Sequence, residues 1–167
     1  MTLDAVGLEV MGHAFASVAE EMGLVLIHSA VSPNIRERRD CSAALFDAAG
    51  EMIAQAAHIP VHLGAVYEAV AAVRALGPGP GDVFILNDPY TGGSHLPDIT
   101  LVGAIEVEGT VGGYSVVRAH HSDVGGKVPG SESSDCTSIF QEGIRLPPVR
   151  ILDLGDTQAR SGNHQRV

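Results

Sequence analysis

Two apolar runs joined by only five residues constrain this fold more than any other feature of the sequence. The runs ITLVGAIEV (99–107) and GYSVVRAH (113–120) have the character of strands, and the intervening EGTVG carries the glycines that hairpin turns favour. The sequence therefore predicts an antiparallel hairpin, in which the start of one strand lies beside the end of the other. A turn centred near Gly109 and Thr110 would place Ile99 opposite His120, and the residue before Ile99 opposite the residue after His120.

This hairpin would bring two histidine-containing motifs together. HLPD holds His95 and Asp98 just before the first strand, and HHSD begins with His120 and His121 at the end of the second. A metal site needs three or four converging His, Asp or Glu ligands, and His95, Asp98 and one of the adjacent histidines would supply three. Successive strand residues face opposite ways, so only one histidine of the pair can point into the site. Asp123 is close enough in sequence to accept the other N–H of a ligating imidazole.

Other polar residues are further candidates for the same site. Asp40 and Glu37, in NIRERRDCS, could donate another carboxylate or could belong to a solvated loop. His58 and His62, in HIPVHLG, flank a proline and cannot share a helical face as paired zinc ligands do, so we expect them to line a cleft or cap the next helix. A mixed nitrogen and oxygen ligand set would suit zinc, manganese or ferrous iron.

The remaining patterns predict an α+β fold, with antiparallel β-hairpins or a mixed sheet packed against two or more helices in a single domain. The segment 23–32 is compatible with a buried helix or a strand. The other expected elements are a helix over 3–22 with Gly23 as its C-cap, a hairpin over 41–56, a helix with an apolar face from Val66 to Leu76, and a buried strand at 83–86. We expect the domain to span residues 1–152 and residues 153–167 to form a poorly ordered tail.

Composition excludes several classes of function. A net charge of −10 and the lack of any basic cluster longer than RERR (36–39) oppose nucleic-acid binding. The longest continuous apolar runs are shorter than the roughly 20 residues of a membrane span, and the N-terminus lacks a basic segment leading into an apolar one, so we expect no membrane partner and a cytoplasmic location. Cys41 and Cys136 match no C-x-x-C pattern and are expected to be free thiols. The sequence also has no P-loop and no G-x-S-x-G motif.

Four long segments resemble, in order, the hydantoinase B/oxoprolinase family. They are SPNIRERRDCSAALFDAAGEMIAQAAHIPVHLG, GDVFILNDPYTGGSHLPDITLV, RAHHSDVGG and EGIRLPPV, and the resemblance covers about residues 20–150. Members are B-type subunits or domains of ATP-dependent enzymes that open lactams and hydantoins, and are related to the acetone carboxylase α subunit. The resemblance implies a divalent metal held by Asp40 or Glu37 together with His95, Asp98 and His120.

The resemblance also implies how the reaction is divided. A partner A-type subunit would bind ATP and activate the amide, while the metal of this chain would handle the attacking water on 5-oxoproline, hydantoin or a related lactam, in a hetero-oligomer. One alternative is a fragment of an acetone carboxylase-type α subunit. Because family chains are several times longer and the last residues do not resemble their continuation, another alternative is a truncated, non-catalytic remnant that acts as an assembly module.

Overall fold

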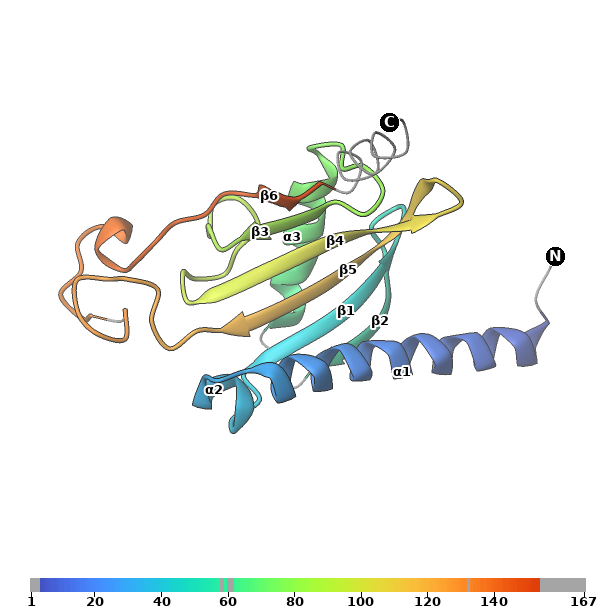
Figure 1. Ribbon diagram of the computed structural model, residues 1–167, viewed down its shortest axis with the longest axis horizontal. Helices are drawn as coiled ribbons and strands as arrows, with labels where there is room; N and C mark the ends of the chain where they lie inside the picture. Colours follow the sequence, from blue (N-terminus) through green and yellow to red (C-terminus); the bar gives the residue numbers. More distant parts are fainter. Residues whose placement is uncertain (1–3, 58, 60–61, 132, 154–167) are drawn as a thin grey trace, which may run out of the picture.

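A computed structural model describes residues 4–57, 59, 62–131 and 133–153. Its elements, in chain order, are α1 (Ala5–Ser29), α2 (Pro33–Arg36), β1 (Cys41–Asp47), β2 (Met52–Ala57), α3 (His62–Arg74), β3 (Val83–Leu86), β4 (Asp98–Val107), β5 (Thr110–His120), the 3-10 helix η1 (Ile139–Gln141) and β6 (Val149–Leu152). Within these residues the strands form one antiparallel sheet in the order β2-β1-β5-β4-β3-β6 (Figure 1). The predicted α+β class is confirmed. The tail from residue 154 lies outside the described residues, so the predicted domain boundary stays a prediction.

The central hairpin is formed by β4 and β5 as predicted, but its register differs by one residue. Its two-residue turn is Glu108–Gly109, whose φ angles of 52° and 79° are the left-handed values of a type I′ turn. The turn lies one residue earlier than expected, and a bulge after Ile105 partly offsets that shift. As a result Asp98 pairs with His120 and not with the histidine that follows it.

The first helix is longer than predicted. Gly23 does not end it; Ala19, Gly23 and Ile27 form the buried stripe of α1, and the segment that could have been a strand continues the helix to Ser29. A glycine on this stripe carries no side chain where the helix approaches the sheet, and packing offsets its low helix propensity. The helix ends before Pro33, which disfavours helical geometry in the residue preceding it.

Apart from this stripe, α1 is mostly exposed. It runs along β1 and β2 on one face of the sheet (Figure 1). Its exposed apolar side chains are Val6, Leu8, Val10, Met11, Val18, Leu24 and Val25. The helix is long and apolar enough to cross a membrane, with a mean hydropathy of 1.4 over its best window. Buried helices of soluble proteins and N-terminal signal sequences meet the same criterion, so the absence of a membrane partner and the cytoplasmic location stay predictions.

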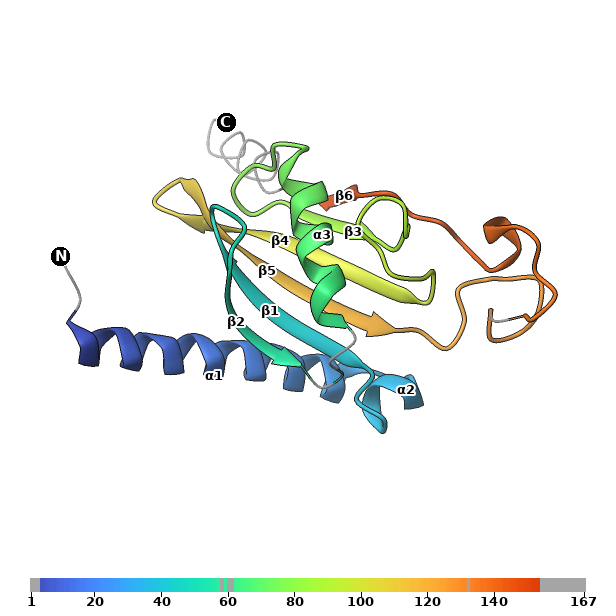
Figure 2. The ribbon, with the colours of Figure 1, turned by 180° about the vertical axis from the view of Figure 1, so that it is seen from behind.

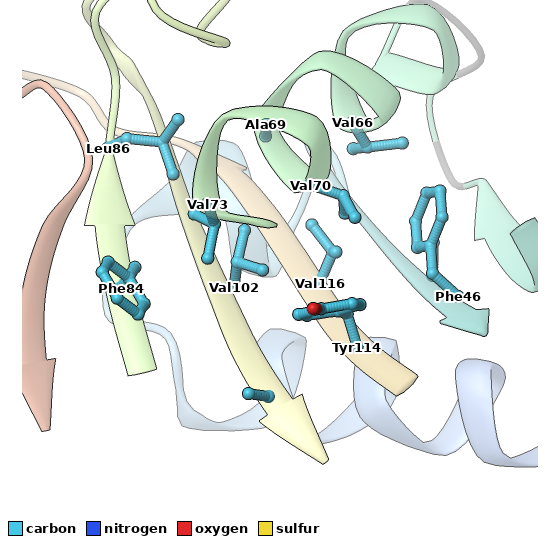
Figure 3. Packing of buried hydrophobic residues seen from close by; sticks show 12 residues of the cluster. Phe46, Val66, Ala69, Val70, Val73, Phe84, Leu86, Val102, Tyr114 and Val116 are labelled. Atoms are coloured by element: carbon cyan, nitrogen blue, oxygen red, sulfur yellow. The ribbon is translucent and has the colours of Figure 1, made fainter. Parts of the chain in front are cut away.

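The main core lies on the opposite face, between the sheet and α3 (Figures 2 and 3). The helix contributes Val66, Ala69, Val70 and Val73, which lie over Phe46, Phe84, Leu86, Val102, Tyr114 and Val116 of the strands. Strand alternation separates the two faces, because Phe46 points to α3 while the preceding Leu45 packs beneath α1. Leu76, expected on the apolar face of the helix, lies beyond its last residue and is exposed.

The edge strand β6 was not predicted from the sequence. It pairs with β3, with Arg150 opposite Phe84, and its four side chains are all exposed. Its short VRIL sequence therefore shows no alternation from which a strand could be recognised. Arg150 also reaches across the edge to the buried carboxylate of Asp82, with Nη1 and Oδ2 3.2 Å apart.

Both cysteines are free thiols, as predicted, and their surroundings differ. Burial, with a smaller contribution from the charge of Asp40, raises the pKa of the Cys41 thiol from 9.0 to about 11. Because this pKa is higher in the folded state, the contribution of the Cys41 thiol to stability is complete below about pH 8.5 and is lost as the pH rises toward 11.

We expect a thiol reagent at pH 8 to modify only Cys136 in the folded protein and both thiols after unfolding. Rapid modification of two thiols without unfolding would contradict this assignment.

Candidate metal centre

Three neighbouring strands turn from apolar to polar at the same end of the α3-covered face. Residues two apart on a strand share a face, so the polar positions continue the rows that form the core. The rows are Asp98, Thr100, Val102 and Ala104 on β4; His120, Arg118, Val116 and Tyr114 on β5; and Asp40, Ser42, Ala44 and Phe46 leading into and along β1. The fold thereby gathers carboxylate, hydroxyl, guanidinium and imidazole groups beside the first turn of α3.

The carboxylate of Asp98 is at the centre of this cluster and is almost fully buried. Its Oδ2 lies 3.1 Å from Nδ1 of His95 and accepts a hydrogen bond of 2.6 Å from the Ser94 hydroxyl, while its Oδ1 lies 3.2 Å from Nδ1 of His120. The imidazole rings of His95 and His120 have centroids 5.0 Å apart. One donor atom from each of His95, Asp98 and His120 lies within 4.8 Å of the others, which is the spacing expected of ligands around one cation.

The loop that carries His95 needs the glycines that precede it. Gly92 has φ +100°, and a Cβ at Gly93 would lie 2.3 Å from the backbone oxygen of Asn87, so a side chain at that position would clash. After this tight turn, the amide of Asp98 donates to the carbonyl oxygen of His95 at 3.0 Å. The histidine and the aspartate are thus held by a constrained loop and not by a helix, as Pro97 predicts.

The electrostatic surroundings keep Asp98 ionised. Burial alone would raise its pKa, but hydrogen bonds from His95 and Ser94 and the nearby imidazoles have a larger combined effect, so the pKa of Asp98 falls well below its usual range. Arg118 is fully buried two residues before His120, and its Nε donates to Thr100 Oγ1 at 2.7 Å. A permanent positive charge therefore lies in the sheet beneath the cluster.

The structure brings together four of the proposed ligands, Asp40, His95, Asp98 and His120, with His62, which was expected to line a cleft. A cavity of about 280 Å³ is lined by Asp40, Ile59, His62, Ser94, His95, Asp98 and His120. Two alternates lie elsewhere, since Glu37 is exposed after α2 and His121, whose pKa is lowered by burial, does not line this cavity. Asp123 does not orient a histidine as expected; it accepts hydrogen bonds within its own loop from the amides of Gly125 and Gly130 and from the hydroxyl of Ser131.

His62 lines the cavity and begins α3, as expected from the sequence, but its contacts with two proposed ligands were not predicted. Its Nε2 lies 3.5 Å from Oδ2 of Asp98 and 3.6 Å from Oδ1 of Asp40, and its ring is almost fully buried. The signal that could have identified it is its position four residues before Val66, which places both side chains on the sheet-facing side of α3. His58, the other histidine of this motif, lies outside the described residues.

A comparison with known families shows to which family the chain belongs. The hydantoinase B/oxoprolinase family model matches residues 4–163. The chain belongs to the hydantoinase B/oxoprolinase family. The resemblance noted in the sequence is thereby confirmed over nearly the whole chain.

The named relatives are much longer than this chain. The 5-oxoprolinase of Saccharomyces cerevisiae is 41% identical over 87% of this chain, which spans 12% of that enzyme. The caprolactamase subunit beta of Pseudomonas jessenii is 35% identical over 92% of this chain, which spans 27% of that subunit. The crystal structure of that ATP-dependent caprolactamase superposes with a TM-score of 0.75 at 28% identity, covering 100% of this chain and 30% of the other.

A structure of acetone carboxylase has the same fold at this level. It superposes with a TM-score of 0.75 at 21% identity, covering 86% of this chain and 20% of the carboxylase chain. At this identity the likeness concerns the fold alone. The same fold therefore occurs in proteins named for different reactions, and the fold alone does not identify the reaction of this chain.

Proposed function

We propose that this chain is the metal-bearing B-type subunit, or a fragment of one, of an ATP-dependent enzyme that hydrolyses 5-oxoproline, hydantoin or a related cyclic amide. The observation that carries the proposal is the buried, ionised carboxylate of Asp98 between the imidazoles of His95 and His120. Relatives named 5-oxoprolinase and caprolactamase support the class of substrate.

The residues present fit a divalent transition metal. Asp40, His95, Asp98 and His120 would hold it, and their mixed nitrogen and oxygen donors suit zinc, manganese or iron better than the all-oxygen environments of magnesium or calcium. A bound cation of this kind lowers the pKa of a water molecule toward neutrality and polarises a carbonyl group. The hydroxyl of Ser94, which donates to Asp98, would keep that carboxylate oriented.

A second cavity next to the centre offers room for the substrate. It has a volume of about 450 Å³ and shares His95 and Ser94 with the metal site. Its remaining lining consists of Pro89, Tyr90, Leu96, Cys136, Thr137, Ser138, Ile139 and Glu142. Most of the exposed lining is polar, with hydroxyl groups and the carboxylate of Glu142 beside a few apolar side chains, and such a wall suits a small ring that carries a polar amide. The ring would then lie against the exposed edge of His95.

In this proposal a partner subunit binds ATP and uses it to activate the amide. The chain has no P-loop motif and a net charge of −10, so an A-type subunit would bind ATP and activate the amide. The caprolactamase relative is itself named as a beta subunit, which supports a hetero-oligomer. We expect ATP-dependent ring opening only when both subunits are combined, measured as release of the amino acid product.

Two rivals make different predictions in the same assay. An acetone carboxylase-type fragment, which the shared fold allows, would consume acetone only in the presence of bicarbonate. A non-catalytic assembly module, which the small share of each relative's length allows, would bind metal and the A-type subunit without turnover of any of these substrates. Ring opening of a lactam or hydantoin would exclude both rivals.

His95→Ala tests the metal site directly. We expect this variant to have a severalfold lower metal content after purification. The imidazole of His95 lies 3.1 Å from the carboxylate of Asp98, and both groups would bind the same cation. His13→Ala is the matched control, since His13 is exposed on α1 and does not line the cavity that contains His95. Elemental analysis after dialysis gives the stoichiometry. Equal metal content in the wild type and both variants would refute the proposed centre.

A further inference from the structure

His62 joins two acids that come from different strands. Asp40 precedes β1 and Asp98 begins β4, and β5 lies between these strands in the sheet. His120, at the end of β5, joins their backbones, because its amide donates to the carbonyl oxygen of Asp40 at 3.0 Å and it pairs with Asp98. The sheet thus fixes the two backbones, but it leaves the separation of the two carboxylates to side-chain contacts. His62 enters from α3, and its Nε2 lies within 3.6 Å of an oxygen of each. It is the side chain through which the two acids are connected.

The charges around the ring determine which nitrogen carries the proton. Two carboxylate oxygens face Nε2, and an imidazole lone pair pointing at them would be repelled, whereas an N–H is attracted to both. Nδ1 must then accept a hydrogen bond. The Ser42 hydroxyl, buried on β1, lies 3.1 Å from Nδ1 and can donate to it, in preference to its longer contact of 3.4 Å with the carbonyl oxygen of Ile59.

Burial agrees with this arrangement. The pKa of His62 is lowered, mainly because burial disfavours the charged ring, with the cation of Arg118 adding to the effect against the carboxylates of Asp98 and Asp40. The contacts of the ring are those of the tautomer that carries its proton on Nε2. The Ser42 hydroxyl thus donates to Nδ1, and the Nε2–H faces the two acids.

We propose that His62 is the positioning residue of the metal centre, oriented by Ser42 and holding the carboxylates of Asp40 and Asp98 at the separation that the cation requires. This inference rests on the proposed function and assigns His62 a role outside the set of ligands. Contacts of 3.5 and 3.6 Å are longer than hydrogen bonds, and we expect them to shorten when a cation draws the two acids together.

The test compares Co²⁺ binding by the full chain and by two replacements of His62. His62→Leu removes the donor while keeping a similar volume, and we expect Co²⁺ affinity, measured by competition with a chelator, to fall about 10- to 100-fold. His62→Gln places an amide N–H near the position of Nε2, so it should recover most of that loss. Ser42→Ala should lower the affinity by a smaller factor, because the ring loses only its orienting donor.

A spectroscopic count separates positioning from ligation. In the Cu²⁺-loaded wild type, electron spin echo modulation should show two coordinated imidazoles, from His95 and His120, and the same two in His62→Leu. Thermal melting of the metal-free variants measures their stability. If the Co²⁺ affinities of His62→Gln and His62→Leu simply followed their melting temperatures, the loss of affinity would reflect a weakened fold and not a positioning role.

The outcomes are distinct. Three imidazoles in the wild type, unchanged Co²⁺ affinity in His62→Leu, or equal losses in the Gln and Leu variants would each overturn the positioning role while leaving the proposed metal centre intact. A wild-type chain that binds neither Co²⁺ nor Cu²⁺ would overturn the proposed function and this inference together.

Discussion

Asp98→Asn should abolish divalent-metal binding, with a loss of affinity greater than about 100-fold. The carboxylate lies within 3.5 Å of three imidazoles, and the substitution removes the negative charge that all three approach. Loss of an outer partner of a metal ligand typically weakens binding 10- to 100-fold, so loss of the central ligand itself should exceed that range. Isothermal titration with Zn²⁺ or Mn²⁺ measures the effect.

Asp123→Asn provides a matched control for the same chemical change. Asp123 lies three residues beyond His120, but its carboxylate accepts hydrogen bonds from Gly125, Gly130 and Ser131 within its own loop. We therefore expect wild-type metal affinity in this variant. If Asp98→Asn bound metal as well as Asp123→Asn does, Asp98 would not be a ligand and the centre proposed here would be wrong.

The part of the site that the sequence predicted well is the part formed by local pairing. A hairpin closed by two residues must bring Asp98 to His120, and an error of one residue in its register did not separate the two motifs. The bulge after Ile105 could not be predicted, because it depends on the packing of the paired strands and on no single residue type.

Contacts between residues that are far apart in the sequence could not be predicted from local sequence patterns. β1 pairs with β5, and this contact places Asp40 beside the site, whereas the spacing of residues left Asp40 and Glu37 as alternatives. His62 reaches the site only because α3 packs across the sheet. The burial of Arg118 could not be predicted from its place in a strand-like run, because its Nη2 donates to the carbonyl oxygens of Ala65 and Gly92, which come from other parts of the chain.

Asn87→Ala should destabilise the fold by about 3–9 kcal/mol, the largest loss we expect from a residue outside the centre. Asn87 is fully buried, its Nδ2 donates to the carbonyl oxygens of Leu96 and Ile144 at 2.8 and 2.9 Å, and its Oδ1 accepts from the amide of Leu146 at 2.7 Å. Alanine would leave three backbone groups without these partners, each at a cost of about 1–3 kcal/mol. A domain of this size has only about 5–15 kcal/mol of stability in total.

Urea denaturation followed by circular dichroism measures this loss, with Asn34→Ala as the control. Asn34 is half-buried on α2, and its backbone carbonyl accepts a hydrogen bond from the amide of Asp40. Because Asn34→Ala keeps this backbone hydrogen bond, it should change the free energy of unfolding by less than about 1 kcal/mol. Because Asn87 connects the loop carrying His95 to the segment 144–146, the variant should also exchange amide hydrogens faster in both places. Wild-type stability together with unchanged exchange there would show that the loop is held by other contacts, and the preorganisation of His95 would then need a different explanation.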